Sequence, residues 1–239
     1  MNRPLRLATF NIKNGLGSDG VVDNDRLAAV CADLRADVLA LQEVDSGATR
    51  SGRANQAAFV ARECGLSHLF APAFELRPGG RYGNALLGRG AFDEIEVLEL
   101  PVAADRQPRV AALARIQIEG EDLALSVAAT HFQNRRGGAP LVAEDAGEQL
   151  EQLTAVLESL GRRRRPRVLL GDLNCAPAVV EPALTAAGFT VAATDATAPA
   201  KAPRLQIDYV AVDRLTIVSA EVVTTSVSDH LAVVVEAKP

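Results

Sequence analysis

Hydrophobic positions along the chain follow two periods, and the longer period predicts helices. In three segments apolar residues recur three or four positions apart, which places them on one face of a helix. The first stripe begins at Leu27, and Asp23 or Asn24 can cap its helix. Gly65 can end the second helix in a left-handed conformation. The predicted helices span residues 24–34, 55–64 and 144–160.

Shorter apolar runs between glycine, proline and charged residues predict strands. Two of these runs, beginning at Leu5 and near Arg167, start a strand-loop-helix pattern, which indicates two packed sheets of related build. Residues 192–203, rich in Ala, Thr and Pro, are expected to form a loop inside this strand-rich region. Because no linker divides the pattern, we expect one domain over residues 1–239. The predicted strands span residues 5–10, 38–42, 83–87, 95–100, 110–118, 123–130, 167–171, 206–212, 216–223 and 231–236.

Composition narrows the class of protein. Of the 239 residues, 48% are hydrophobic and 23% are charged, which excludes a disordered or collagen-like chain. Cys31, Cys64 and Cys175 form no CxxC pair, so neither a disulfide framework nor a zinc site is indicated. No apolar run reaches the roughly 18 to 20 residues of a membrane span, and the N-terminus lacks a signal-peptide pattern. We expect a monomeric, cytoplasmic protein with no integral membrane association.

The charge balance restricts the choice of partner. The chain carries 25 basic and 30 acidic residues, a formal net charge of −5, so its overall field repels nucleic acids and anionic membranes. It has no tryptophan, and aromatic residues make up 4% of the sequence, which disfavours recognition by base stacking. A polyanionic substrate therefore requires a local positive patch or a bound metal.

Acids, amides and histidines gather at the ends of the predicted strands. A single Asp or Asn after a strand commonly forms a turn or caps a helix. Six such places, which together use two of the three histidines in the chain, indicate a shared site instead. They are residues 9–11, 41–43, 129–131, 171–174, 206–209 and 228–230.

These residue types meet the requirements of phosphate-ester hydrolysis. A hard divalent cation, held by carboxylate and amide oxygens, neutralises the charge that develops on the phosphoryl oxygens. A base must orient the attacking water, and a histidine or another cation must lie beside the phosphate. The candidates for these roles are Asn11, Glu43, His131, Asp172, Asn174, Asp208, Asp229 and His230.

Seven segments containing these residues form a recognisable series. They are ATFNIKNG (8–15), LALQEVD (39–45), YGNALLGR (82–89), THF (130–132), LLGDLN (169–174), IDYV (207–210) and SDHL (228–231). In content and order the series resembles the endonuclease/exonuclease/phosphatase superfamily, which includes pancreatic deoxyribonuclease, abasic-site endonucleases, neutral sphingomyelinases and inositol polyphosphate 5-phosphatases. The resemblance implies an α+β fold of four layers, in which two mixed β-sheets pack face to face with helices outside. It also implies a site at one rim of the sandwich.

The resemblance assigns three residues to a metal. Glu43 matches the family's principal ligand of Mg²⁺ or Mn²⁺, and Asn11 lies beside it in the motif series, where it binds the metal or a phosphate oxygen. Asp229 completes the metal shell or contributes to a second metal position. The implied cofactor is Mg²⁺ or Mn²⁺.

Five residues take catalytic roles by the same resemblance. Asp172 orients or deprotonates the attacking water, and Asn174 holds the scissile phosphate. His230, oriented by Asp208, stabilises the phosphoryl oxygens or acts as an acid or base, because an Asp–His pair fixes one tautomer and favours its charged form. His131 contacts the phosphate from the other side, as in the deoxyribonuclease-like branch.

Substrate binding is expected from Lys13, Asn84 and Arg109. Lys13 stands where abasic-site endonucleases have an aspartate ligand, so it indicates a cation that touches the substrate. Arg109 can clamp a phosphate through its guanidinium, although a structural arginine is an equal alternative. Asn84 can orient His131 or simply pair with the backbone. Ala232 replaces a proline that commonly follows the SDHL motif, a change expected to affect the stiffness of the loop.

The expected function is that of a metal-dependent phosphodiesterase that cleaves a phosphorus–oxygen bond by in-line attack of activated water. Nucleic acid is the slightly favoured substrate, and hence an endonuclease or exonuclease activity, because His131 supports it even though the acidic balance of the chain disfavours it. A lipid or small-molecule phosphodiesterase or phosphatase, sphingomyelinase-like or inositol-phosphatase-like, is the alternative. A further alternative is a catalytically silent module that only binds a phosphorylated partner. The presence of Glu43, Asp172 and His230 disfavours this alternative, since a silent module is expected to lack one of them.

Overall fold

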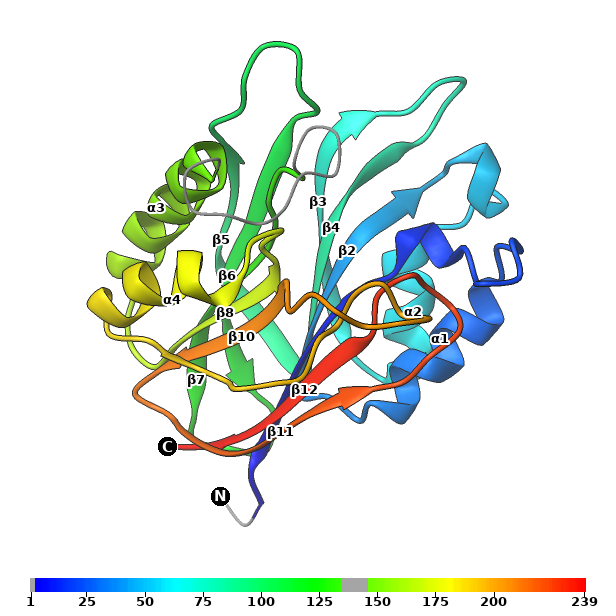
Figure 1. Ribbon diagram of the computed structural model, residues 1–239. Helices are drawn as coiled ribbons and strands as arrows, with labels where there is room; N and C mark the ends of the chain where they lie inside the picture. The colour runs from blue at the N-terminus through cyan, green and yellow to red at the C-terminus, as the bar shows by residue number, and fades with distance from the viewer. Residues whose placement is uncertain (1–2, 135–145) are drawn as a thin grey trace.

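The computed structural model describes residues 3–134 and 146–239, and two six-stranded sheets packed face to face form its centre (Figure 1). In spatial order the first sheet consists of β11 (Thr216–Val223), β12 (Ala232–Lys238), β1 (Leu5–Asn11), β2 (Val38–Ser46), β4 (Arg81–Gly88) and β3 (Ser67–Glu75). The second sheet consists of β5 (Gly90–Leu100), β6 (Arg109–Ile118), β7 (Ala124–His131), β8 (Arg167–Asp172), β10 (Asp208–Asp213) and β9 (Thr190–Val191).

Helices cover the outer face of each sheet (Figure 1). α1 (Asn24–Asp33) and α2 (Gln56–Cys64) pack on the first sheet, and α3 (Gly147–Gly161) and α4 (Pro177–Ala186) pack on the second. The short 3₁₀ turns η1 (Lys13–Gly15) and η2 (Thr49–Ser51) follow β1 and β2. The expected four-layer fold is confirmed. Among the described residues, each helix is too short or too polar to traverse a lipid bilayer.

Three apolar layers hold the sandwich together, because the central strands are buried on both faces. In β1, Leu5 and Leu7 pack between the sheets, whereas Ala8 and Phe10 pack against the helices. The layer between the second sheet and its helices includes Leu153 of α3. Such strands have near-continuous apolar sequences. That property explains why the central strands are readily predicted from the chain.

One parallel pair of strands lies inside each sheet and determines where polar residues meet. β1 runs parallel to β2 in the first sheet, and β7 runs parallel to β8 in the second. The other paired strands in the described residues run antiparallel. The carboxyl ends of both parallel pairs lie at the same rim, where Asn11 at the end of β1 contacts Asp172 at the end of β8.

Edge elements differ most from the sequence-based expectation. β3 was not predicted, since it is partly exposed and contains Pro72, a residue that an edge strand tolerates. β5 starts at Gly90 rather than at residue 95, because its first half is exposed at the edge of the second sheet. The two-residue strand β9 is also additional.

Two helices also differ from the expected bounds. The helix implied after β8 is α4, whose extent was not predicted because Pro177 and Pro182 both lie within it. α3 begins at Gly147, and residues 144–145 of the predicted helix lie outside the described residues.

Candidate active site

Three neighbouring strands of the second sheet bring catalytic candidates side by side. β7 ends at His131 and β8 ends at Asp172, and these two residues are partners in the parallel register. β10 begins at Asp208, which is the antiparallel partner of Asp172. His131, Asp172 and Asp208 therefore occupy adjacent positions across the sheet, and all three are buried. Sheet register brings together residues that are widely separated in the sequence.

The end of β8 needs a glycine for this approach. A Cβ atom at Gly171 would lie 2.1 Å from the carbonyl oxygen of Thr130 on β7. Asp172 then begins a tight turn in which its Oδ1 accepts a hydrogen bond from the backbone N–H of Asn174 at 2.9 Å. Asn174 has a left-handed backbone, with φ of 49°, and its side-chain amide donates to the carbonyl of Phe132 at 3.1 Å. The GDLN motif thus holds the Asp172 carboxylate in place.

Glu43 reaches the same rim from the first sheet through a bulge. The register between β2 and β4 shifts between Leu41 and Val44, and Glu43 adopts an unusual left-handed φ of 59°. Bulges of this kind redirect a side chain and are frequent near active sites. The Asn11 amide joins the two sheets, because its Nδ2 donates to Glu43 Oε1 at 3.2 Å and to Asp172 Oδ2 at 3.1 Å.

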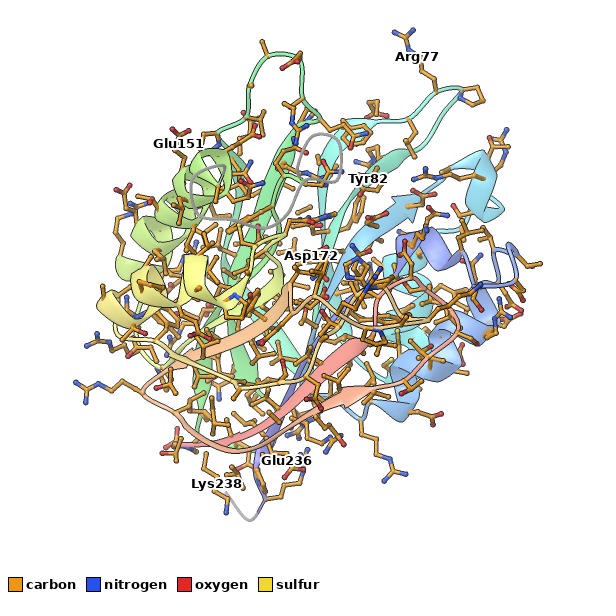
Figure 2. All side chains as sticks on the ribbon, viewed as in Figure 1. Arg77, Tyr82, Glu151, Asp172, Glu236 and Lys238 are labelled. Carbon is orange, nitrogen blue, oxygen red and sulfur yellow. The ribbon has the colours of Figure 1, made fainter. Side chains whose placement is uncertain are left out.

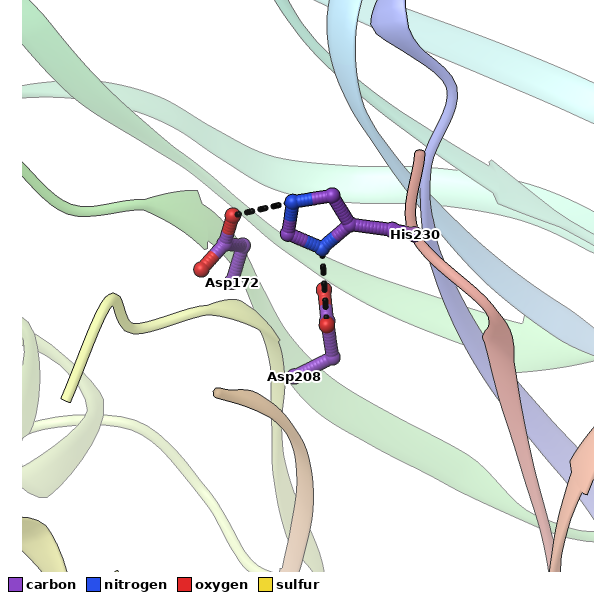
Figure 3. Close-up of side chains that lie close together, drawn as sticks. All are labelled: Asp172, Asp208 and His230. Atoms are coloured by element: carbon purple, nitrogen blue, oxygen red, sulfur yellow. Dashed lines mark hydrogen bonds and ion pairs between the residues drawn. The ribbon is translucent and has the colours of Figure 1, made fainter. Parts of the chain in front are cut away.

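His230 lies between two aspartates (Figure 3). Its Nδ1 is 2.9 Å from Asp208 Oδ2, and its Nε2 is 3.8 Å from Asp172 Oδ2. The Thr197 hydroxyl also donates to Asp208 Oδ2, at 2.5 Å, so this oxygen is held from two sides. The loop before β12 is tied to the site by Ser228, whose hydroxyl donates to the carbonyl of Asn11 at 2.6 Å.

His131 approaches Asp172 from the opposite side. Its Nε2 lies 3.5 Å from Asp172 Oδ2, and its Nδ1 lies 3.2 Å from Arg109 Nη1. Because a guanidinium can only donate, Nδ1 must accept and the ring proton is placed on Nε2, toward Asp172. Arg109 is itself buried and also donates from Nη2 to Gln133 Oε1 at 3.3 Å. Arg109 therefore sets the tautomer of His131.

The buried charges at this rim shift one another's pKa values. Burial and the charge of Asp208 raise the pKa of Asp172 to about 7. Burial opposes a charge on His230, but Asp208 and Asp172 outweigh that effect and raise its pKa to about 10. Burial, together with the charges of Arg109 and His230, holds the pKa of His131 well below its usual value. The site thus combines a carboxylate that titrates near neutrality with one cationic and one neutral imidazole.

The three residues expected to bind substrate lie in different surroundings. Arg109 lies beside the candidate residues, because it contacts His131. Asn84 donates from Nδ2 to the carbonyl oxygen of Val110 at 2.8 Å, which is a backbone contact. Lys13 Nζ lies 2.5 Å from Asp229 Oδ2 in a half-exposed ion pair. Lys13 and Asp229 line a separate pocket of about 300 Å³.

A pocket of about 330 Å³ opens beside Asp172 and the two histidines. Glu43, His131, Asp172, Asn174 and His230 line one part of it. The remaining lining comes from Arg109 and six further residues. They are Arg50, Phe74, Leu76, Tyr82, Gln107 and Asn134.

Two of the residues missed by sequence reasoning contact the site through other side chains. Thr197 lies in the Ala-, Thr- and Pro-rich loop, and no local pattern distinguishes it from its neighbours. Arg50 lies in η2 and binds Asp45 of the QEVD segment. In the sequence, only the presence of Asp45 indicated a role for this arginine. Neither contact can be inferred without the fold.

Comparison with known proteins agrees with this geometry. Residues 8–230 match the model of the Endonuclease/Exonuclease/phosphatase family. No curated protein matches significantly. Among solved structures, a family protein from Beutenbergia cavernae DSM 12333 is 24% identical, with a TM-score of 0.78, over 99% of this chain and 72% of that one.

Two further structures share the fold at lower identity. A family protein from Leptotrichia buccalis C-1013-b is 16% identical, with a TM-score of 0.76, over 98% of this chain and 100% of that one. A mannosyl-6-phosphatase from Bacteroides thetaiotaomicron VPI-5482 is 17% identical, with a TM-score of 0.72, over 98% and 99% of the two chains. Since the family match extends over most of the sequence and includes every strand-end motif described above, the chain belongs to the endonuclease/exonuclease/phosphatase family.

Proposed function

We propose that this protein is a divalent-metal-dependent hydrolase that cleaves a phosphate ester by direct attack of water. Members of its family are generally hydrolases of phosphate esters. The observation that carries the proposal is the environment of Asp172. This carboxylate is buried, oriented by Asn11 and Asn174, and placed within 4 Å of an imidazole nitrogen on either side. Such a group can accept a proton from water near neutral pH.

The donor set at the rim fits a hard cation. Glu43 and Asn11 are the proposed ligands, because carboxylate and amide oxygens are of the kind that Mg²⁺ and Mn²⁺ prefer. Asn11 Nδ2 faces Glu43 and Asp172, while its Oδ1 accepts a hydrogen bond from the backbone N–H of Lys13 at 3.1 Å, so the amide must turn over to bind a metal through its oxygen. Asp229, the third predicted ligand, pairs with Lys13 and must exchange that partner to bind a metal. When bound, the cation would neutralise charge on the phosphoryl oxygens.

A second group of possible ligands is better explained as a proton relay. Oxygens of Asp172 and Asp208 and a ring nitrogen of His230 lie within 4.8 Å of one another. His230 Nδ1 is occupied by Asp208, however, which orients the ring. The Oδ1 atom of Asp208 has no hydrogen-bond partner within the described part of the chain. We assign Asp208 to positioning His230.

The side chains of the site then divide the work of hydrolysis. Asp172 orients the water and takes its proton as the oxygen attacks phosphorus. His230, cationic and fixed by Asp208, donates a hydrogen bond from Nε2 to a phosphoryl oxygen or to the leaving group. His131 remains neutral and presents its Nε2–H, and the Asn174 amide contacts the phosphate. No covalent intermediate with the protein is needed.

Two substrate classes remain for this chemistry. A small-molecule or lipid-headgroup phosphoester is favoured by the size of the pocket, about 330 Å³, which is at the lower end of ligand sites. One relative of similar fold is a mannosyl-6-phosphatase. A nuclease activity is the second candidate, supported by the deoxyribonuclease-like position of His131. A soluble cytoplasmic monomer that acts on such a substrate is part of the proposal.

A substrate panel tests the proposal. The purified protein is assayed with bis-para-nitrophenyl phosphate, sugar phosphates, inositol phosphates, sphingomyelin vesicles, duplex DNA and RNA, with Mg²⁺, Mn²⁺ or EDTA. We expect hydrolysis that requires the metal and, in ¹⁸O water, one labelled oxygen per phosphate released in a single turnover. Glu43→Gln should lower activity by at least ~100-fold, about 2.7 kcal/mol of barrier. His68→Ala, an exposed histidine on β3, is the control. Activity that survives in EDTA or in Glu43→Gln would contradict the proposal.

A further inference from the structure

An arginine on the pocket wall is held by a completely buried acid. Arg50 donates from Nε and Nη2 to the two carboxylate oxygens of Asp45, at 2.8 and 2.7 Å. The Asp45 side chain has no exposed surface, whereas that of Arg50 is 47% exposed. Paired hydrogen bonds of this geometry fix the plane of a guanidinium. Arg50 is therefore a preorganised cation at the pocket.

The outer end of Arg50 is free to meet a ligand. Nε and Nη2 serve Asp45, and no hydrogen bond from Nη1 is present within residues 3–134 and 146–239. Arg109, the other arginine of the pocket, differs because Nη1 and Nη2 already contact His131 and Gln133. An arginine with an unused edge is suited to binding an oxyanion.

Aromatic side chains flank Arg50. Its guanidinium carbon lies 5.8 Å from the centre of the Tyr82 ring, and the Tyr82 and Phe74 rings are 4.9 Å apart. Both rings line the pocket together with Leu76. They form an apolar surface on the β3–β4 hairpin, beside a fixed positive charge. Glu43, His131 and Asp172 line the same pocket.

The positions of the charged side chains around this pocket favour a ligand with two anionic groups. Asp45, which neutralises Arg50, lies behind the wall and is not part of the lining. Glu43 and Asp172 also line the pocket, and both have roles in the proposed hydrolysis. A single phosphate bound beside Asp172 leaves the unused Nη1 of Arg50 without an anionic ligand. A second anionic group on the same small molecule would fill that position.

We infer that Arg50 selects small phosphate esters that carry a second anionic group, with the body of the molecule packed on Tyr82 and Phe74. The inference deepens the proposed function and rests on it. The expected substrate class is a compact bisphosphate, or a phosphate ester with a carboxylate at its other end. Arg50 acts as a specificity determinant that contacts the substrate and takes no part in the chemical step.

Affinity for a matched pair of ligands tests the inference without relying on turnover. Fructose 1,6-bisphosphate and fructose 6-phosphate are titrated into the full chain by calorimetry in EDTA, where no hydrolysis is expected. The wild-type protein should bind the bisphosphate at least about tenfold more tightly, since a charge-assisted hydrogen bond contributes this much or more. Arg77→Ala is the matched control, because Arg77 extends away from the pocket at the tip of the hairpin (Figure 2).

Two variants of Arg50 distinguish a loss of binding from a loss of folding. Arg50→Ala alone would leave the buried Asp45 unpaired, so Asp45→Asn/Arg50→Gln removes both charges together. Its preference for the bisphosphate should fall below about threefold, with a melting temperature near that of the wild type. Arg50→Lys keeps a charge beside Asp45 but loses the planar fork, and it should show an intermediate preference.

The possible failures are distinguishable. Equal affinity of the wild-type protein for both ligands, or an unchanged preference in the double variant, would overturn the role of Arg50. An absence of metal-dependent hydrolysis across the whole substrate panel would contradict the proposed function and leave the affinity result standing.

Discussion

Two buried aspartates at one rim of the sandwich have partners that differ from those of two buried aspartates at the other rim. At the rim opposite the candidate site, Asp37 binds Arg3 and Arg89, with distances of 2.6 and 2.7 Å. Asp213 binds Arg165 and Arg167 there in the same way, at 2.7 and 2.8 Å. At the site rim, Asp172 and Asp208 instead contact histidines, amides and a hydroxyl. Asp172 lies away from the end of the molecule that carries Glu236 and Lys238 (Figure 2).

The partners decide what each acid can do. Burial alone would raise the pKa of Asp37, but Arg3, the backbone N–H of Arg6 and Arg89 outweigh that effect and lower it. At Asp172, burial and the charge of Asp208 outweigh His230 and the hydrogen bonds from Asn11 and Asn174, so its pKa is raised to about 7. Burial is therefore common to structural and catalytic acids in this fold. Within the described residues, Asp172 and Asp208 have no arginine partner, which fits the proposed roles of Asp172 as a base and of Asp208 as the group that orients His230.

Removing an acid from the structural rim should have the largest effect on stability. Asp213→Ala leaves Arg167, which is 7% exposed, without its carboxylate and should lower the free energy of unfolding by about 3 kcal/mol. The melting temperature should fall by roughly 6–12 °C. Activity per folded molecule should not change. Asp122→Ala, at an exposed turn, is the control. If the Asp213 variant kept the stability of the wild type, the structural role of the aspartates at this rim would be contradicted.

Removing an acid from the site rim should have the converse effect. Asp172→Asn keeps the shape of the side chain but cannot accept the proton of water, so hydrolysis should fall by at least ~100-fold, about 2.7 kcal/mol of barrier. His230→Ala should cause a loss of the same order. The free energy of unfolding of Asp172→Asn should not fall at neutral pH, because no arginine is left unpaired and a buried charge with a raised pKa is removed. Retained activity in either variant would contradict the proposed mechanism.

The two rims should lose stability at opposite ends of the pH scale. His230 has a raised pKa, so its contribution is fully present below pH 6.5 and is lost as the pH rises through about 10. Asp172, raised from 3.8 to about 7, likewise loses its contribution as the pH rises through about 7. Asp37 has a lowered pKa, so its contribution is present above pH 3.8 and is lost as the pH falls.

Urea unfolding in EDTA across the pH range measures this difference. Each proton should contribute a slope of at most about 1.4 kcal/mol per pH unit. His230→Gln should flatten the decline above pH 6.5, and Asp37→Asn should flatten the decline below pH 3.8. A wild-type stability that increases from pH 7 to pH 9 would show that the histidine is not charged by its aspartates.

Much of the sandwich follows from the sequence because its central strands are buried on both faces. Burial on both faces requires continuous apolar runs, as in β1 and β8, and such runs can be recognised locally. Edge elements obey weaker rules, so β3 with Pro72 and α4 with Pro182 were missed. The motif residues were also apparent, since the tight turn after Gly171 and the polar ends of strands leave a local pattern.

What the sequence by itself determined is therefore the layered fold and the identity of the chemical groups, because periodicity and short motifs are properties of neighbouring residues. Apart from the pair of Asp208 and His230, which the family resemblance implies, only the tertiary structure decided which partners these groups have. Arg109 was found to set the tautomer of His131, Thr197 to hold Asp208, and Asp45 to orient Arg50. The first contact joins strands β6 and β7, the second joins a loop to the start of β10, and the third depends on the turn after β2. The charge state and orientation of a buried group depend on such partners, so they emerge only when the chain is folded.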